Sequence, residues 1–300
     1  MKKLLIIIGG MIGFLVLAVG GYAYYLYSSI SDTASTMHEN IVRESNHREA
    51  AASPEKDDPI SFLLLGIDNE DTESGRSDTM IVLTVNPNKE SIKMVSIPRD
   101  TRTEIIGRGR EDKINHAYAF GGAQMAIDTV ENFLNIPIDY IVSINLDGFE
   151  DIVDTVDGVT VNNNLAFEHK GFDFPEGELH LSGEEALAYV RMRKEDPEGD
   201  LGRNERQRDV VDAIIHEGAN LSSIIKAGDF LSILGENVRT NMTFDEMKDF
   251  QDDYRSSRHN IETLEMSGDG TTIDGIYYMN IHEEVRNHVS ETLRKHLELD

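Results

Sequence analysis

The sequence predicts an α/β fold, an α-β-α sandwich in which helices flank a mixed central sheet. The apolar run Ile60–Asp68 has the length of a strand that is buried on both faces. Two further strand-like runs, Thr79–Val85 and Ile92–Ile97, are joined by the turn signal Asn86–Lys89, which predicts a hairpin. Helical and strand patterns then alternate toward the C-terminus without an internal repeat. We therefore expect a single folded domain over residues 60–300.

The amino terminus has the pattern of a membrane anchor. Lys2 and Lys3 precede the uncharged run Leu4–Ile30, which as a helix is about 40 Å long and crosses a bilayer with tilt. A cleaved signal peptide would have a shorter apolar region and a clear cleavage site. Lysines before the span hold the amino terminus inside the cell. We expect a single-pass type II protein of the cell membrane, with residues 1–30 as cytoplasmic tip and transmembrane signal anchor.

The composition agrees with a domain outside the cytoplasm. Residues 31–59 are polar and charged, and we expect them to form an extracytoplasmic linker. The chain has no cysteine, so the domain is held by its core and not by disulfides. A formal charge of −27 excludes non-specific binding of nucleic acid, which requires a basic face. Against this background, local clusters of arginine are informative.

Charged side chains gather where the predicted strands begin and end. Arg99 and Asp100 follow the third strand, and Asp78 begins the second. In a hairpin, these two ends lie at the same edge of the sheet, and Asp68 at the end of the first strand joins them if that strand runs parallel to the third. Open α/β sheets bind ligands at this edge. The alternative is a surface ion pair with carboxylates that only cap turns.

The two carboxylates suit a hard divalent ion. Mg²⁺ takes oxygen ligands and usually keeps waters or phosphates in its coordination shell. We therefore predict that Asp68 and Asp78 hold Mg²⁺, with Mn²⁺ as the alternative ion.

Several other segments are expected to build the core. Apolar periodicity and turn residues predict helices at Gly121–Asn135, Asp147–Val156, Phe244–Tyr254 and from about Asn280, and strands at Asp139–Leu146 and Ile261–Met266. Gly268 and Gly270 flank Asp269 in what we expect to be a turn at the rim of the site.

More arginines follow in two adjoining segments. Ser182 and Glu185 form a capping box, which predicts the start of a helix. Arg191 and Arg193 reach one ligand only if the chain leaves this helix and extends there, as we expect. The acidic, glycine-containing loop 194–202 has the character of a mobile lid. Beyond it, Arg203 and Gln207 lie on one face of the next helix.

Arg206 and Arg208 on that helix have a second interpretation. Both are flanked by carboxylates, so they are also explained as surface charges that pair with Glu205 and Asp209.

Four arginines together in an acidic protein indicate a pyrophosphate ligand. Guanidinium groups bind phosphate oxygens in a bidentate manner and stay charged at all physiological pH values. The residues concerned are Arg99, Arg191, Arg193 and Arg203.

Seven separated blocks of the sequence occur in a characteristic order. The blocks are GID (66–68), RSDTMIVLTVNP (76–87), SIPRDT (96–101), KINHAYAFGG (113–122), VDGV (156–159), LSGEEALAYVRMR (181–193) and GDLGRNERQRDVV (199–211). Several separated motifs are more specific than a single short one. Together they resemble the LytR-CpsA-Psr family of cell-wall glycopolymer ligases.

The resemblance implies an activity and its substrates. A membrane-anchored phosphotransferase would move an anionic glycopolymer, such as a wall teichoic acid precursor, from an undecaprenyl-pyrophosphate carrier to the muramic acid 6-hydroxyl of peptidoglycan. Similar proteins hold the prenyl tail in an apolar channel within the domain. The family pattern also places Lys113 near the phosphates, whereas for His116 we expect a structural role.

Roles for individual residues follow from this reaction. Arg99 and a magnesium ion screen the charge of the transferring phosphoryl group, and Asp78 or Asp100 is the candidate base, although phosphoryl transfer asks little of one. We therefore predict Arg99, Asp100 and Asp78 as catalytic residues. The predicted pyrophosphate-binding residues are Arg99, Arg191, Arg193, Arg203, Gln207 and Lys113.

Two other functions use the same residues. A lipid-pyrophosphate hydrolase would have water as the acceptor. A regulator would bind polyprenyl phosphate without catalysis, although the absence of a helix-turn-helix signature argues against a direct DNA role.

Overall fold

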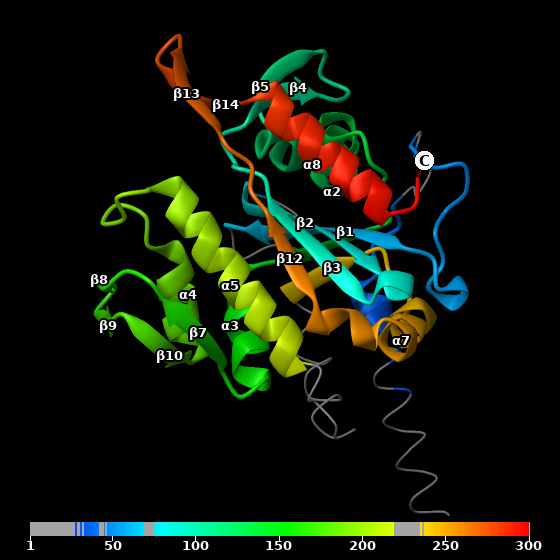
Figure 1. The fold of residues 1–300 in the computed structure, drawn as a ribbon, viewed down its shortest axis with the longest axis horizontal. Coiled ribbons are helices and arrows are strands. Elements are labelled where there is room, and N and C mark those ends of the chain that lie inside the picture. The colour runs from blue at the N-terminus through cyan, green and yellow to red at the C-terminus, as the bar shows by residue number, and fades with distance from the viewer. Residues whose placement is uncertain are drawn as a thin grey trace, which may run out of the picture.

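A six-stranded sheet forms the centre of the fold (Figure 1). The computed structural model describes residues 28, 31, 33–41, 45, 47–68, 75–218, 235 and 237–299. The strand order is β11-β6-β1-β2-β3-β12, with bounds β1 Ile60–Ile67, β2 Ser77–Asn86, β3 Ser91–Ser96, β6 Tyr140–Ile144, β11 Val238–Thr240 and β12 Ile261–Leu264. β1 pairs antiparallel with β2 and parallel with β6, and β3 pairs antiparallel with β2 and parallel with β12. The predicted mixed sheet and its hairpin are confirmed.

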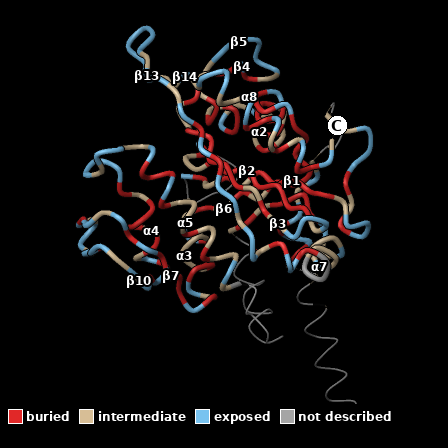
Figure 2. The backbone as a smooth tube through the Cα atoms, viewed as in Figure 1, coloured by how far each residue is buried: buried red, intermediate tan, exposed pale blue. Residues whose placement is uncertain are grey.

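Helices cover both faces of this sheet. They are α2 His116–Leu134, α3 Leu146–Thr155, α4 Gly183–Arg191, α5 Asp200–Gly218, α7 Phe244–Asp253 and α8 Glu283–His296. Leu63 and Leu65 of β1 pack toward α2 and α8, which lie together on one side in Figure 1. Phe62 of the same strand packs toward α5 and α7, because successive strand residues point to opposite faces. The α-β-α sandwich is therefore confirmed, and Figure 2 shows β1 and β2 at its centre as mostly buried.

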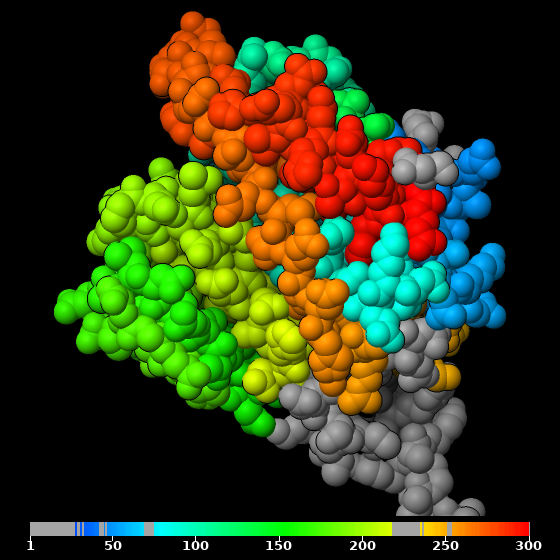
Figure 3. All heavy atoms as spheres, viewed as in Figure 1, coloured from blue at the N-terminus to red at the C-terminus, as the bar shows by residue number. Residues whose placement is uncertain are grey.

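Four small antiparallel pairs surround the main sheet. They are β4 Arg102–Ile105 with β5 Arg110–Lys113, β7 Val159–Asn163 with β10 Gly177–Leu181, β8 Phe167–His169 with β9 Phe172–Phe174, and β13 Gly268–Ile273 with β14 Ile276–Ile281. Short 3-10 turns lie at Pro54–Lys56, Pro87–Lys89 and Arg255–His259. The β13–β14 hairpin stands out from the body of the molecule (Figures 1 and 3).

The structure corrects several expected boundaries. α2 begins at His116, and the expected start at Gly121 is instead a kink inside it, where Gly122 has a φ of 63°. α5 begins at Asp200, whose carboxylate favours a helix N-terminus. The turn expected at 268–270 is part of β13. Residue Asn280, the expected start of the last helix, lies in β14, and α8 begins at Glu283.

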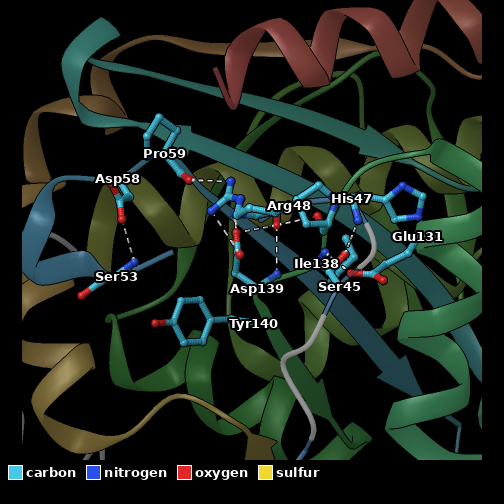
Figure 4. A network of polar contacts seen from close by, with 12 residues as sticks. Ser45, His47, Arg48, Ser53, Asp58, Pro59, Glu131, Ile138, Asp139 and Tyr140 are labelled. Carbon is cyan, nitrogen blue, oxygen red and sulfur yellow. Dashed lines mark hydrogen bonds and ion pairs between the residues drawn. The ribbon is translucent and has the colours of Figure 1, made fainter. Parts of the chain in front are cut away.

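A buried polar network lies at the end of the sheet where β1 and β6 begin (Figure 4). Arg48 Nη1 is 3.2 Å from Asp139 Oδ1, and Arg48 Nη2 donates to the carbonyl of Pro59 at 3.0 Å. Asp139 Oδ2 accepts from the backbone N–H and the hydroxyl of Ser61, both at 2.9 Å. Nearby, burial raises the pKa of Glu131 to about 7. This network ties residues before β1 to the opposite end of the sheet from Asp68.

The predicted membrane span falls almost entirely outside the described residues. Within residues 1–30 the structure describes only Ser28. In the part of the chain that the structure describes, no helix is long and apolar enough to cross a membrane.

Candidate functional site

Three predicted side chains meet at the edge where β1 and β3 end and β2 begins. β1 and β3 both run antiparallel to β2, so their carboxyl ends lie at the same edge. Arg99 Nη1 is 2.8 Å from Asp78 Oδ2. The register between β1 and β2 shifts between Gly66 and Ile67, which pair with Thr79 and Ser77 and so skip Asp78; such irregularities are common next to functional sites. The prediction that Asp68, Asp78 and Arg99 share one edge is confirmed.

A cavity of about 630 Å³ lies between the sheet and helices α3, α4 and α5. We call it the apolar cavity, because most of its exposed wall is apolar. The apolar residues that line it come from the central strands and the three helices, and are Leu64, Leu65, Ile67, Ile81, Ile144, Leu146, Phe149, Leu187, Val190 and Val211. Polar residues also line it, namely Asp68, Asp78, Thr79, Asn145, His169, Arg191, Arg193, Lys194, Glu195, Arg203 and Gln207.

The arginines reach this cavity because α4 ends where the sequence predicts. Its capping box is formed, and its last residue is Arg191. Met192 then adopts an extended conformation, with φ −61° and ψ 134°. The chain therefore leaves the helix as expected, and Arg191 and Arg193 both line the cavity. Arg191 Nη2 donates to Asp68 Oδ1 at 3.3 Å.

Arg203 lies deepest among these cations. Its side chain is 8% exposed, and its Nη2 is 2.9 Å from Asp200 Oδ1. Asp200 Oδ1 also lies 3.5 Å from Arg193 Nε. Burial lowers the pKa of the Arg203 guanidinium, Asp200 partly offsets this effect, and the nearby charge of Arg99 lowers the pKa further. Its Nε has no hydrogen-bond partner in the described part of the chain, and Nη2, although close to Asp200, does not form a well-aligned hydrogen bond with it. Such buried donors call for an anionic ligand.

The pKa of Arg99 is shifted upward, in contrast to that of Arg203. Burial opposes its charge, but the carboxylates of Asp78, Asp200 and Asp100 outweigh that effect and raise its pKa. Its Nε lacks a hydrogen-bond partner among the described residues. The guanidinium is therefore firmly charged and keeps a donor for a ligand.

A second cavity of about 390 Å³, the polar basin, adjoins the first. Its lining is almost entirely charged or polar, and consists of Asp68, Gly75, Arg76, Asp78, Arg99, Asp100, Lys113, Asn115 and His116. Asp68 and Asp78 belong to both cavities and form their common wall. Lys113 Nζ is 2.6 Å from Asp100 Oδ1. The predicted site residues are thus divided between two adjoining cavities.

Arg76 and Asn115 line the basin although the sequence analysis assigned them no role. Arg76 lies two residues before Asp78, so the argument from strand ends that found Asp78 also applies to Arg76. Asn115 carries no local signal, since its place follows from the packing of the segment before α2 onto the turn after β3.

Arg206 is a structural residue. Its side chain is 7% exposed, and Nη1 lies 2.6 Å from Asp196 Oδ2, a carboxylate that is 4% exposed. Arg206 also donates to the carbonyls of Tyr189 and Met192. Its interpretation as a surface charge is therefore wrong, because it is buried and holds the segment after α4. Arg208 is half-buried, and the carboxylates of Asp209 and Glu205 lie near it.

Asp68 and Asp78 have the donor chemistry for a divalent ion that brings other ligands with it. Among the described residues, no group of three or more His, Cys, Asp or Glu side chains could hold a metal ion. Two carboxylates at the common wall fit Mg²⁺, which is often bound by one or two carboxylates and by substrate phosphates.

Fold and site together define a class of α/β protein that binds a ligand with a long apolar part and an anionic head. The chain belongs to the LytR_cpsA_psr family, which matches residues 24–295. It is 57% identical over the whole of both chains to the polyisoprenyl-teichoic acid--peptidoglycan teichoic acid transferase TagU of Halalkalibacterium halodurans. It is 51% identical to the protein of that name from Bacillus subtilis, covering 99% of this chain and 97% of that one.

Solved structures of the same family have this fold. The crystal structure of B. subtilis TagU matches with a TM-score of 0.66 and 50% identity, covering 80% of this chain and 97% of that one. The structure of TagT bound to LIIa-WTA matches with a TM-score of 0.75 and 33% identity, covering 87% of this chain and all of that one.

Proposed function

We propose that this protein is a membrane-anchored phosphotransferase. It moves an anionic glycopolymer of the wall teichoic acid type from an undecaprenyl-pyrophosphate carrier to the muramic acid 6-hydroxyl of peptidoglycan. One observation carries the proposal, namely that a single cavity combines an apolar wall with three arginines. The names of the relatives support it. A prenyl chain matches the wall, and a diphosphate matches the guanidinium groups.

Each part of the site has a task in this reaction. The apolar cavity holds the prenyl chain, and Arg191, Arg193, Arg203 and Gln207 bind the diphosphate. Arg99 lies across the common wall and neutralises charge on the phosphoryl group being transferred. Mg²⁺, or Mn²⁺, on Asp68 and Asp78 supplies further neutralisation when bound. The acceptor oxygen forms a bond to the phosphorus that carries the sugar, and the bond from that phosphorus to polyprenyl phosphate breaks.

The carboxylates proposed as bases are both held by cations. Asp78 faces Arg99, and Asp100 faces Lys113 at 2.6 Å. Each carboxylate is therefore already engaged in an ion pair with a neighbouring cation. Their contribution is therefore to orient the cations, with proton transfer as a lesser role.

The anchor belongs to the same proposal. A type II span at residues 1–30 would keep the domain outside the cell membrane, beside a lipid-linked donor and the wall.

A transfer assay tests the function. Purified full-length protein in detergent receives labelled lipid-linked donor and a peptidoglycan oligomer, with Mg²⁺ present or removed by a chelator. We expect label on the glycan, loss of transfer on chelation, and recovery when Mg²⁺ or Mn²⁺ is restored. Release of free polymer without attachment would identify a hydrolase instead. Donor binding with neither product would identify a binding protein.

A further inference from the structure

We propose that the polar basin is the binding site for the acceptor hydroxyl, and that His116, held by Asp112, receives the proton of that hydroxyl. This inference rests on the proposed function and adds to it the acceptor side of the reaction. It assigns a chemical role to His116, for which the sequence alone indicated a structural one.

The positions of the two cavities indicate from which side the acceptor approaches. In phosphoryl transfer the attacking and leaving oxygens lie roughly in line, on opposite sides of the phosphorus. The leaving group, polyprenyl phosphate, belongs to the apolar cavity. Asp68 and Asp78 form the wall between that cavity and the basin. A phosphorus held at this wall therefore exposes its far side to the basin, and the acceptor must approach from there.

The lining of the basin indicates how the acceptor is bound. Asn115 is 4% exposed, yet its Oδ1 has no hydrogen-bond partner among the described residues. Its backbone is fixed, because its N–H donates to the carbonyl of Arg99 and its carbonyl accepts from the hydroxyl of Ser77. A buried and unpaired amide oxygen costs free energy unless a ligand donates a hydrogen bond to it. A sugar hydroxyl or acetamido group provides that partner, and Asn115 is a positioning residue for it.

The contacts of His116 indicate which of its ring nitrogens can receive the proton. Its Nδ1 is 3.0 Å from Asp112 Oδ1. Asp112 is held in turn, because its Oδ1 accepts from the backbone N–H of Lys113 at 2.8 Å and its Oδ2 lies 3.6 Å from Arg110. With Nδ1–H donating to the carboxylate, Nε2 carries the lone pair and is free to accept a proton, as in a catalytic triad.

Other candidates on the basin are less suitable. Asp78 and Asp100 are both ion-paired, as described above, whereas the contact of His116 with Asp112 is made by Nδ1 and leaves Nε2 for the acceptor. The ring of His116 also packs edge-on against Phe120, at 5.7 Å between centroids, which fixes its plane. The charged groups around the ring and the basin are Asp68, Arg76, Asp78, Arg99, Asp100, Arg108, Arg110, Asp112 and Lys113.

The step is balanced in atoms and electrons. The acceptor oxygen forms its bond to phosphorus as its proton passes to His116 Nε2. The bond between that phosphorus and the bridging oxygen breaks, and the electron pair leaves with polyprenyl phosphate. The proton on His116 returns to solvent, and no oxidant or further reactant is required.

The test compares His116→Gln, Asp112→Asn and Asn115→Ala with wild type in the transfer assay. His288→Gln is the matched control, because His288 is an exposed histidine of α8 that lines neither cavity. We expect His116→Gln to lower kcat about 10²–10³-fold, within the usual range for a general base, and Asp112→Asn to lower it less. Donor binding should stay unchanged in both. Asn115→Ala should raise the KM for the acceptor more than it changes kcat.

The pH profile separates a chemical role from a structural one. In wild type, proton transfer to the imidazole should make kcat/KM fall on the acidic side of the profile. His116→Gln should remove this limb. The proposal is overturned if His116→Gln keeps more than a third of wild-type kcat, if its acidic limb persists, or if Asn115→Ala leaves the acceptor KM unchanged.

Two further controls keep the outcome clear. If His116→Gln does not fold, Asp112→Asn is the deciding variant, because it keeps the imidazole ring. An unchanged kcat and pH profile in Asp112→Asn would exclude the pair of His116 and Asp112 as the proton acceptor. Failure of the proposed function looks different, because the wild-type protein itself would then show no transfer.

Discussion

The two cavities share a wall but are built from different parts of the chain. The apolar cavity takes its lining from three central strands and three helices that are far apart in sequence. The polar basin takes its described lining from Asp68, residues 75–78 and residues 99–116. One side suits a hydrocarbon chain and the other suits charged and hydroxylated groups. The contrast indicates that the fold keeps the two ends of an amphipathic reaction apart, with Asp68 and Asp78 between them.

Arg203 and Arg206 of α5 also differ in their roles. Substitution of Arg206 has the largest expected effect, which is on the free energy of unfolding. Arg206→Ala leaves the carboxylate of Asp196 buried without its partner, which should cost about 3–5 kcal/mol in the free energy of unfolding. Arg203→Ala removes a cation that burial already disfavours, so stability should change little while donor affinity falls. Urea unfolding and donor binding measure the two effects. The reverse pattern would mean that Arg206 faces the ligand and Arg203 holds the fold.

Arg99 is expected to have the largest effect on chemistry alone. Arg99→Ala removes a charged donor from the common wall and should lower the rate of transfer about 10²–10³-fold. Single-turnover transfer measures this rate apart from product release. Arg102→Ala is the matched control, because Arg102 forms only a partly exposed ion pair with Glu111 on a neighbouring hairpin. Equal losses in the two variants would contradict a specific role for Arg99.

Phe149 tests the apolar side with a smaller effect. Phe149→Ala removes an aromatic ring from the cavity wall, and donors with a full prenyl chain should bind about tenfold more weakly. Donors with a short chain should bind almost as before, because they do not reach this wall. Phe172→Ala serves as control, since Phe172 is also partly buried but lies outside the cavity. If both chain lengths lost affinity equally, the cavity would not be the prenyl site.

His296 has the smallest expected effect on the site and contrasts with His116. It is 2% exposed, and burial lowers its pKa to about 4. Because the pKa in the folded protein is lower than the ordinary 6.5, its contribution to stability is complete above pH 6.5 and is lost as the pH falls toward 4.

His296→Gln should therefore reduce the difference between the urea midpoints at pH 7 and pH 4.5. The rate of transfer at pH 7 should stay unchanged. A variant that lost transfer while its stability kept the wild-type pH dependence would show that the two histidines have been assigned the wrong way round.

Local patterns in the sequence predicted the strands and the edge where they end. The runs at 60–68, 79–85 and 92–97 are apolar enough to be central strands, and once their order is known, Asp68, Asp78 and Arg99 must meet. The capping box at Ser182 likewise placed the end of α4 and the two arginines beyond it. Each of these predictions depends only on residues that are close together in the sequence.

Other features depend on packing between distant segments. Periodicity marks Leu64, Phe149 and Val211 as apolar but does not show that they leave a cavity between them. Arg206 resembles its neighbours in sequence, and only the return of the 192–196 segment makes it a buried partner of Asp196. The small antiparallel pairs are short and mostly polar, so their pattern is weak.

A structure of the protein with a lipid-linked diphosphate donor and Mg²⁺ tests the central claim most directly. We predict a diphosphate in contact with Arg99, Arg191 and Arg193, an ion on Asp68 or Asp78, and a prenyl chain along Phe149 and Val211. A donor whose chain lies outside the apolar cavity, with these guanidinium groups left in solvent, would contradict the account.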